Sequence, residues 1–361
     1  MKEVQFRYNP VAPMVVVPPK LNFNQLDTHH QPDSSNFITL NHRAIGVPWL
    51  TSLPAPQQSR HWCIAKSAAR EIIKELIDGG TFTHGALPAE INTTRHAEKV
   101  EELVNTAASC VIHLFPSEYP RQTALVTKTL VLLWIHDDVV EPEATNINET
   151  CLDYAVSDSS KSGIIQSLFR QITEENLVAG LRLVEGVLSF TKFTRTHKSL
   201  YGKRFETIRE YFEFREQDIA AQYMVAAVEF SAGLALSTED LADLNDLVHL
   251  YGLHSFMIND LYSYDKEVRE KNSGCSVSNA VMTIQDILDV SPLIAKSVLL
   301  NKIWDVEMMM EKFLIRWYTS HEASEQQLRF AQCLIQSAAG NVFFSATVKR
   351  YAEHGTHSET N

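Results

Sequence analysis

Cysteine is scarce in this sequence, and its spacing is irregular. The chain has five cysteines in 361 residues, and no two of them form a CxxC pair. A disulfide framework or a cysteine-rich zinc site requires a denser and more regular set of thiols. We therefore expect free thiols and a reducing compartment.

Long hydrophobic runs are also missing. No apolar run approaches the ~18–20 residues of a membrane-spanning helix, and the amino end lacks the charged start and apolar core of a signal peptide. We expect a cytoplasmic protein with no stable membrane insertion.

Positive charge is the third shortage. The 32 lysine and arginine residues are outnumbered by 44 aspartate and glutamate residues, which gives a net charge of −12. Nucleic acids are bound through concentrated lysine and arginine, so this balance argues against a nucleic-acid partner. An anionic ligand would have to be held by a few placed cations or by metal ions.

Strand-like alternation is almost absent, and hydrophobic residues make up 45% of the chain. After residue 59, apolar residues recur instead at the spacing of helices. We expect helices at residues 59–77, 97–114, 121–140, 160–170, 175–194, 201–230, 239–267, 276–291, 292–319 and 325–350. The pattern predicts an all-α fold.

The chain divides into three parts by composition. Eight prolines interrupt residues 1–59, which predicts an extended amino-terminal arm. Residues 60–351 form the expected helical domain, and residues 352–361 form a flexible tail.

One stretch places three oxygen-bearing side chains on a single helix face. Asn259, Ser263 and Glu267 are spaced four residues apart, so each step turns the helix by about 40° and the three span about 12 Å of its axis. Amide, hydroxyl and carboxylate oxygens suit Mg²⁺. The alternative is a solvated helix face. The apolar run at residues 250–258 argues against it, because this run predicts a buried helix.

A second acidic cluster follows the apolar run at residues 130–135. Asp137 and Glu141 lie four residues apart, with Asp138 beside Asp137. Carboxylates next to a buried run need a counter-charge, and a metal ion would supply it. A helix that ends in water is the alternative for this cluster taken alone. His136 is not expected as a ligand, because imidazole suits Mg²⁺ poorly.

Together the two clusters resemble the metal motifs of class I terpene synthases. Residues 137–141, Asp-Asp-Val-Val-Glu, are similar to the aspartate-rich DDxxD/E motif. Residues 259–267, Asn-Asp-Leu-Tyr-Ser-Tyr-Asp-Lys-Glu, match the motif (N/D)Dxx(S/T)xxxE at every defined position. Glu141 departs from the commoner final aspartate of the first motif.

Four further residues carry the resemblance. Arg215 lies 44 residues before Asn259, where microbial members have a diphosphate-sensing arginine. Lys266 is similar to a lysine of fungal-type sesquiterpene cyclases that meets diphosphate. Arg350 and Tyr351 resemble the closing Arg-Tyr pair of the family. The resemblance implies catalytic roles for all four.

The resemblance also implies a fold and an activity. The fold is a single α-helical bundle with a central apolar pocket. The activity is that of a carbon–oxygen lyase acting on phosphates: a linear prenyl diphosphate, by preference farnesyl diphosphate, is ionised and cyclised to a sesquiterpene hydrocarbon or alcohol. The implied cofactor is Mg²⁺, expected as three ions with Mn²⁺ as a substitute, and the implied assembly is a monomer or homodimer.

Aromatic residues one or two helical turns below the motifs are candidates for the pocket wall. The candidates are Trp134, Phe256, Phe115 and Phe212, with Tyr211, Trp317, Phe343 and Phe344 after them. The alternative for each one is ordinary core packing. Asp218 and Ile219 join the pocket through the resemblance, since related cyclases have a helix break there.

Three other functions remain open. The first is a cyclase that acts on geranyl or geranylgeranyl diphosphate instead of farnesyl diphosphate. A chain-elongating prenyltransferase would need a second aspartate-rich motif, which the Asn/Ser/Glu motif is not. A helical interaction protein without activity would not need two oxygen clusters.

Overall fold

The computed structural model describes residues 4–23, 35–78, 94–140, 152, 163–197, 200, 202–320 and 323–352, without the side chains of residues 94–96, 138–140 and 320. Within these ranges the chain forms thirteen helices and two short strands. The helices are α1 (Trp62–Asp78), α2 (Thr94–Leu114), α3 (Pro120–Val140), α5 (Gly163–Glu175), α6 (Leu177–Thr196), α7 (Ile208–Asp218), α8 (Ala221–Ser231), α9 (Thr238–Asp243), α10 (Asn245–Asn272), α11 (Ala280–Leu288), α12 (Pro292–Ser320), α13 (Glu325–Thr347) and α14 (Lys349–Ala352). The strands are β1 (Phe37–Thr39) and β2 (Gln57–Ser59). The predicted all-α fold is confirmed.

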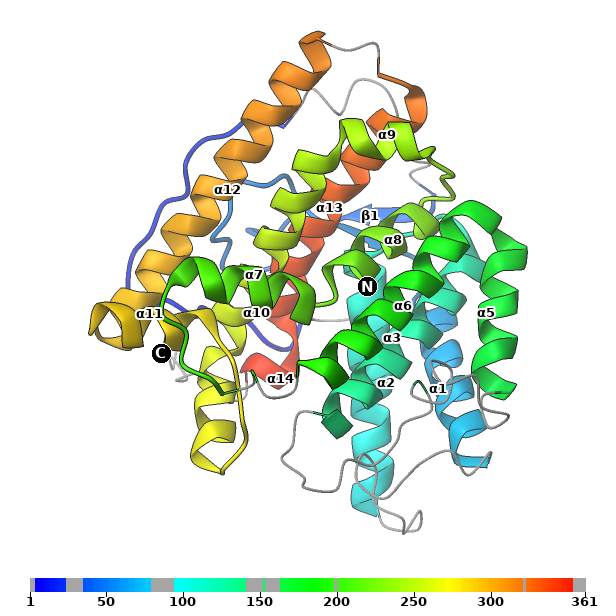
Figure 1. Ribbon diagram of the computed structural model, residues 1–361, viewed down its shortest axis with the longest axis horizontal. Coiled ribbons are helices and arrows are strands. Elements are labelled where there is room, and N and C mark those ends of the chain that lie inside the picture. Colours follow the sequence, from blue (N-terminus) through cyan, green and yellow to red (C-terminus); the bar gives the residue numbers. More distant parts are fainter. Residues whose placement is uncertain are drawn as a thin grey trace.

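Helix α10 occupies the middle of the bundle. It packs against α12 and α13 along its length and contacts α7, α8, α11 and α14 as well (Figure 1). The side chains of Phe256, Met257 and Ile258 on this helix are fully buried. The apolar run before Asn259 therefore carries the second motif into the interior of the protein.

Two close helix crossings form the walls around α10. An added Cβ at Gly340 of α13 would lie 1.9 Å from the carbonyl oxygen of His113 in α2. At Gly186 of α6, an added Cβ would lie 2.7 Å from Cα of Tyr223 in α8. No side chain fits at either crossing, so glycine sets how closely these helices approach.

Three of the expected helices are each divided in two. The range 201–230 contains α7 and α8, separated at Ala220, which has φ 59° and ψ 40°. The range 239–267 is divided at Leu244, and the range 325–350 at Val348, which is extended with φ −77° and ψ 134°. Apolar residues continue through each break, so periodicity alone does not reveal them.

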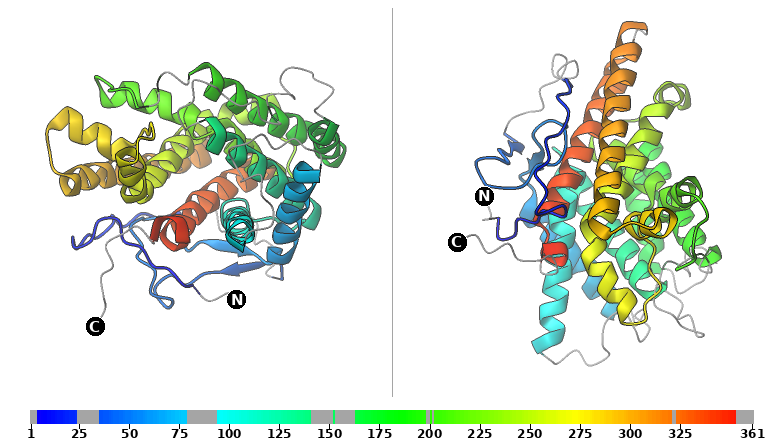
Figure 2. Two further views of the ribbon diagram at one scale, coloured as in Figure 1. Left: turned by 90° about the horizontal axis from the view of Figure 1, so that it is seen from below. Right: turned by 90° about the vertical axis from the view of Figure 1, so that its left-hand side faces the viewer.

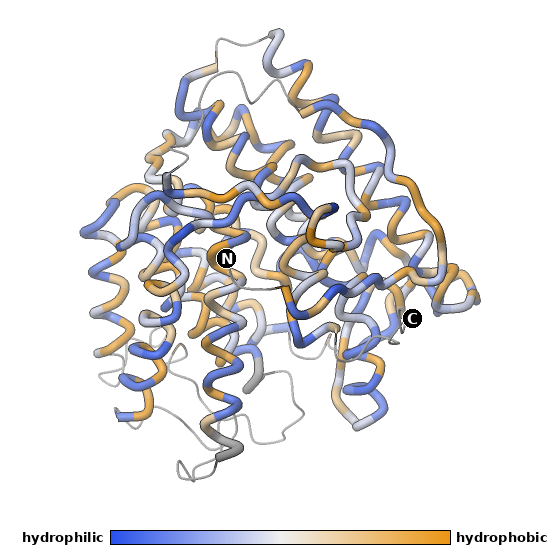
Figure 3. The backbone as a smooth tube through the Cα atoms, turned by 180° about the vertical axis from the view of Figure 1, so that it is seen from behind, coloured by the Kyte–Doolittle hydropathy of each residue, from blue (hydrophilic) through white to orange (hydrophobic). Residues whose placement is uncertain are grey.

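The amino-terminal arm lies along one side of the bundle, against α12 and α13 (Figure 2). The backbone N–H of Tyr8 donates to the carbonyl of Ala346 at 2.8 Å, and the indole N–H of Trp304 donates to the carbonyl of Leu50 at 2.8 Å. Seen from behind, the arm alternates between short hydrophobic and hydrophilic stretches (Figure 3). Some of its apolar side chains belong to the main core, namely those of Tyr8, Val11, Phe23, Leu40, Val47, Leu50 and Leu53. The division into arm, domain and tail stays a prediction, and residues 353–361 lie outside the described ranges.

Two observations bear on the compartment. Cys63, Cys110, Cys275 and Cys333, the cysteines in the described ranges, are free thiols. No helix in the same ranges combines the length and apolarity needed to cross a membrane.

Candidate functional site

The second motif forms one stripe on α10. Asn259 and Glu267 line a cavity, together with Ser255 one turn before Asn259. Ser263 lies between them on the same stripe and is buried. The four-residue spacing thus brings both ends of the predicted ligand set to a single cavity.

Asn279 holds two of these side chains together, and sequence reasoning missed it. Its amide nitrogen lies 2.9 Å from Oε2 of Glu267 and 3.5 Å from Oγ of Ser263, and it also donates to the carbonyl of Asp260 at 2.8 Å. The oxygens of Ser263 and Glu267 therefore converge on one point. Asn279 is also the N-cap of α11, and an asparagine before an apolar helical run was the signal that could have found it.

Arg215 is anchored by a network of carboxylates. Its guanidinium donates to Asp260 Oδ1 from Nε at 3.0 Å and from Nη2 at 2.9 Å, and also to the carboxylate of Asp218. Burial alone would lower the pKa of Arg215, but Asp260 and Asp218 raise it well above its usual value. The guanidinium is thus charged, and Nη2 also donates to Oδ1 of Asn259 at 3.1 Å. Arg215 and the first residue of the second motif are therefore in direct contact.

Asp260 is the buried partner that fixes this arrangement. It accepts hydrogen bonds from the hydroxyl of Tyr211 and, at 2.8 Å, from the backbone N–H of Ala280, in addition to Arg215. Burial raises the pKa of Asp260 to about 6, and the guanidinium of Arg215 opposes that shift. The carboxylate is ionised above that pH and ties α7, α10 and α11 together.

The carboxyl-terminal pair reaches the same cavity from α14. Arg350 and Tyr351 both line it. The amide Nδ2 of Asn259 donates to the hydroxyl oxygen of Tyr351 at 2.8 Å. Burial raises the pKa of Tyr351 to about 12, so the hydroxyl keeps its proton. That proton is available for an oxygen atom inside the cavity.

The first motif is only partly described. Asp137, in the last turn of α3, lines the cavity opposite the stripe on α10. The side chain of Asp138 and all of Glu141 lie outside the described residues. His136 is buried, with Nε2 2.9 Å from Oγ1 of Thr194. It does not line the cavity.

Lys266 lines the cavity but already has an acidic partner. Its ammonium group lies 2.8 Å from Oε2 of Glu270, one turn further along α10. Both side chains belong to the cavity wall. Lys266 can therefore bind an anion in the cavity only if that anion competes with Glu270 for its ammonium group.

The cavity has a volume of about 170 Å³, and its wall combines aromatic and aliphatic side chains with charged and polar ones. Its aromatic side chains are Phe115, Trp134, Phe190, Tyr223, Phe344 and Tyr351. Phe190 and Tyr223 were not anticipated, since nothing in the sequence relates α6 and α8 to the motifs. Ile219 and Ala220 at the break between α7 and α8 also line the cavity, next to Asp218.

Phe212 and Phe256 do not line this cavity, which corrects the expectation for both. Their rings pack edge to face against each other at 5.0 Å. Phe256 lies one turn before Asp260, which faces α7 and α11, whereas Ser255 lies one turn before Asn259, which faces the cavity. Counting one turn back from Asp260 instead of Asn259 shifts the expected position by one residue, which is a rotation of about 100° around the helix. The candidates Tyr211, Trp317 and Phe343 are also absent from the wall.

The chemistry of the donor set fits a hard divalent cation. Asn259, Ser263, Glu267 and Asp137 offer one amide, one hydroxyl and two carboxylates, and two of these oxygens converge near Asn279. Mg²⁺ favours such oxygen ligands over nitrogen or sulfur. Within the described ranges no three His, Cys, Asp or Glu side chains gather as a metal cluster.

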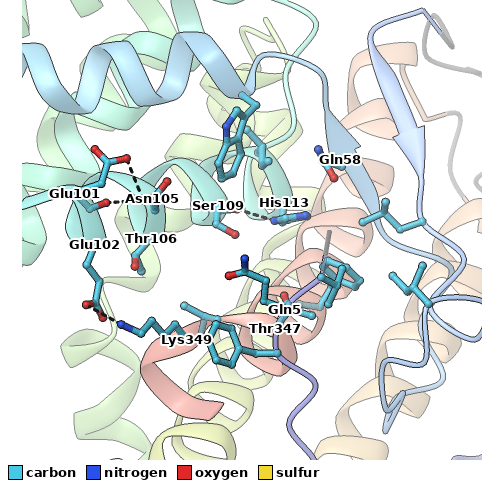
Figure 4. Close-up of a pocket in the computed structure, with 18 of the residues that line it drawn as sticks. Gln5, Gln58, Glu101, Glu102, Asn105, Thr106, Ser109, His113, Thr347 and Lys349 are labelled. Carbon is cyan, nitrogen blue, oxygen red and sulfur yellow. Dashed lines mark hydrogen bonds and ion pairs between the residues drawn. The ribbon is translucent and has the colours of Figure 1, made fainter. Parts of the chain in front are cut away.

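A larger cavity, of about 830 Å³, lies elsewhere and contains neither motif. It is enclosed by the arm, α1, α2 and the end of α13 (Figure 4). Size alone would therefore have selected the wrong site, and the convergence of both motifs with Arg215, Arg350 and Tyr351 identifies the smaller cavity as the candidate functional site.

Comparisons with known proteins agree with this arrangement. The family model "Terpene synthase family 2, C-terminal metal binding" matches residues 128–305. Terpene cyclase 6 from Gibberella fujikuroi is 32% identical over 351 residues, which cover 97% of this chain and 95% of that protein.

Solved structures are similar in fold. Aristolochene synthase from Penicillium roqueforti is 18% identical, with a TM-score of 0.61 over 79% of this chain and 95% of that one. The 2-methylisoborneol synthase from Streptomyces coelicolor, solved with Mg²⁺ and 2-fluoroneryl diphosphate, is 15% identical, with a TM-score of 0.63 over 83% of this chain and 95% of that one. The expected family is thereby confirmed: the chain belongs to the terpene cyclases, within the fungal-type class I terpene synthase family.

Proposed function

We propose that this protein is a Mg²⁺-dependent sesquiterpene cyclase that ionises farnesyl diphosphate and cyclises the resulting carbocation. One observation carries the proposal: the stripe of α10, Asp137 of α3, Arg215 of α7 and the pair on α14 all meet at one cavity, whose wall also includes aromatic side chains. This combination places groups that can bind metal and diphosphate next to aromatic rings.

The metal would be held by Asn259, Ser263 and Glu267 on one side and by Asp137, with Asp138 and Glu141, on the other. Mg²⁺, expected as three ions with Mn²⁺ as a substitute, would supply Lewis-acid stabilisation of the departing diphosphate. The relative from Streptomyces coelicolor was solved with Mg²⁺ and a prenyl diphosphate analogue, which supports this choice of ion and ligand.

The charges of the cavity wall support a metal-assisted anion site. The wall carries four carboxylates and three cations, namely Asp137, Asp218, Glu267, Glu270, Arg215, Lys266 and Arg350. Protein charges alone therefore do not favour a diphosphate, and divalent cations would reverse the sign of the rim.

The proposed ionisation breaks the bond between the allylic carbon and the diphosphate oxygen. The electron pair stays on that oxygen, where Arg215, Lys266, Arg350 and the hydroxyl of Tyr351 donate hydrogen bonds as negative charge builds up. Arg215 is already oriented by Asp218 and Asp260, so little reorganisation would be needed.

The carbocation would remain in the apolar chamber below the rim. The faces of Phe115, Trp134, Phe190, Tyr223 and Phe344 would each contribute about 0.5–2 kcal/mol of cation–π stabilisation, in the absence of competing water. The chamber would also fold the chain before ring closure. Either proton loss or addition of water would end the reaction, as a hydrocarbon or an alcohol respectively.

Parallel incubations with geranyl, farnesyl and geranylgeranyl diphosphate, each with and without Mg²⁺, test this proposal. Extracts are analysed by gas chromatography and mass spectrometry, and the aqueous phase is assayed for diphosphate. A cyclic C15 product from farnesyl diphosphate, formed only with metal, is expected. A cyclic C10 or C20 product would replace the sesquiterpene assignment, and a longer linear diphosphate would replace cyclisation with chain elongation.

A further inference from the structure

We propose that Tyr8 of the amino-terminal arm is a positioning residue for the metal-binding stripe: it holds Asp265, and through Asp265 the end of α10 that carries Glu267. The metal affinity of the candidate site would then depend on the arm, although no residue of the arm lines the cavity. The effect on the metal rests on the proposed function, whereas the hold of Tyr8 on α10 does not.

The last turns of α10 leave the core of the bundle. Residues 260–264 are buried, whereas residues 265–272 are half-buried or exposed. Glu267 belongs to this outer part, so core packing fixes its position less firmly than that of Ser263. The placement of Glu267 therefore depends on polar contacts that hold the end of the helix from its sides.

Asp265 lies on the side of α10 opposite the stripe. It comes two residues before Glu267, and two steps of about 100° turn the side chains about 200° apart. The carboxylate of Asp265 accepts a hydrogen bond from the hydroxyl of Tyr8 and lies 3.1 and 3.2 Å from the ammonium group of Lys296 in α12. On the stripe side, Asn279 donates to Glu267 at 2.9 Å. The end of α10 is thus held from two opposite sides.

Both partners of Asp265 are themselves buried. Tyr8 and Lys296 are only 6% and 7% exposed, so water cannot readily take the place of Asp265 at either group. The ring of Tyr8 packs edge to face on Tyr262 at 6.0 Å, and the ammonium of Lys296 lies 4.7 Å from the ring centre of Tyr264. These ring contacts fix the hydroxyl and the ammonium in front of one carboxylate.

Tyr8 also connects α10 with the end of α13. Its backbone N–H donates to the carbonyl of Ala346 at 2.8 Å, four residues before Arg350. Inside the cavity, Asn259 donates to the hydroxyl oxygen of Tyr351 at 2.8 Å. The helix that carries the stripe and the segment that carries the Arg-Tyr pair are therefore linked twice, once within the cavity and once through the arm. Loss of the Tyr8 hydroxyl breaks the outer link at α10 and leaves the backbone hydrogen bond to α13.

Hydrogen–deuterium exchange of the metal-free protein tests the hold on α10 without any substrate. Tyr8→Phe keeps the ring and removes only the hydroxyl, so the amides of residues 265–272 should exchange about threefold faster or more, as expected for the loss of one hydrogen bond. Thr51→Val is the matched control, because Thr51 donates from the same arm to the buried carboxylate of Glu307 in α12, away from the second motif. Unchanged exchange in Tyr8→Phe, or equally fast exchange in Thr51→Val, would overturn the proposal.

The effect on the metal is tested by titrating Mg²⁺ against the protein with an excess of farnesyl thiodiphosphate, an unreactive analogue. Tryptophan fluorescence follows binding, since Trp134 lines the cavity. Tyr8→Phe should raise the Mg²⁺ midpoint by about three- to tenfold, below the roughly 10–100-fold typical of groups bonded directly to a metal ligand. Thr51→Val should leave the midpoint unchanged. An unshifted midpoint in Tyr8→Phe, or an equal shift in Thr51→Val, would refute the positioning role.

A double-substitution cycle tests whether the effect passes through Asp265. In the Asp265→Ala protein, Tyr8→Phe should shift the Mg²⁺ midpoint by less than about twofold. A full further shift would contradict the proposed route. No response of the unmodified protein to Mg²⁺ and the analogue would refute the proposed function, while faster exchange in Tyr8→Phe would still establish the hold of Tyr8 on α10.

Discussion

Replacing Asp260 by asparagine should test the buried ion pair with Arg215, because it removes the charge and leaves the size of the side chain nearly unchanged. The side chain is fully buried, and asparagine has nearly the same volume, so no cavity is created. The change removes the charge that faces Arg215 at 2.9 and 3.0 Å. It also turns an amide NH₂ toward groups that are themselves donors, the hydroxyl of Tyr211 and the N–H of Ala280.

Breaking a buried ion pair by removing one partner costs about 3–5 kcal/mol. Two features place Asp260→Asn near the lower end of that range. Arg215 keeps its contact with Asp218, and the variant avoids the cost of burying an ionised Asp260, whose pKa burial raises to about 6. We therefore expect a loss of about 3 kcal/mol in the free energy of unfolding.

Urea unfolding at pH 7.5, followed by far-UV circular dichroism, measures this loss. Asp246→Asn is the matched control on the same helix. Asp246 is exposed in the first turn of α10, so its loss should cost about 1 kcal/mol or less. Equal effects of the two substitutions, or a loss below about 1 kcal/mol for Asp260→Asn, would refute the account of Arg215 as a buried cation held by Asp260.

Three further outcomes are expected. Gly340→Ala should destabilise the fold by about 1–3 kcal/mol or more in the same assay, because its Cβ would lie 1.9 Å from the His113 carbonyl oxygen, whereas Gly163→Ala, with nothing within 4 Å, should be neutral. Burial lowers the pKa of His113 from 6.5 to about 4, so the unfolded chain takes up a proton before the folded protein does. The stability due to this group is therefore fully present above about pH 6.5 and is lost as the pH falls toward 4, by about 3 kcal/mol. His113→Gln should lack that part of the pH dependence, and parallel curves for the two proteins would contradict the assignment. Trp134→Leu should change the product distribution in gas chromatography while Phe256→Leu should not, and the reverse result would place the cavity on the other face of α10.

The sequence was most informative where spacing along one helix decided the geometry. Asn259 and Glu267 face one cavity because steps of four residues keep to one stripe, and α10 is long enough to carry both. The placement of these two side chains was therefore predictable without any knowledge of packing. A buried run followed by carboxylates likewise pointed to Asp137, which lines the same cavity.

Contacts between helices were beyond this reasoning. Asn279 reaches Glu267 across the turn into α11, and Tyr223 enters the chamber only because α8 begins after a break at Ala220. Neither the break at Ala220 nor the packing of α6 and α8 beside the motifs changes the spacing of apolar residues in the sequence. Phe256 is an example: it was expected in the cavity wall because it lies one turn before Asp260, but the cavity-lining position is the neighbouring Ser255, and Phe256 lies in the core.

The larger cavity illustrates a second limit. Its walls combine the arm with α2 and α13, and the arm has no periodic pattern from which to predict its path. Hydrogen bonds such as that from Tyr8 to Ala346 fix that path only after the helices have packed. A site built from such segments can be found in a structure and not in a sequence.

The central claim is that α10 presents a metal-binding stripe to a prenyl diphosphate. The most direct test measures diphosphate release from farnesyl diphosphate as Mg²⁺ is titrated, for the unmodified protein, Glu267→Gln and Glu270→Gln. Both glutamates line the cavity about one turn apart, but only Glu267 belongs to the stripe. We expect Mg²⁺-dependent release that Glu267→Gln nearly abolishes and Glu270→Gln largely retains. Release without metal, or equal activity of the two variants, would contradict the account.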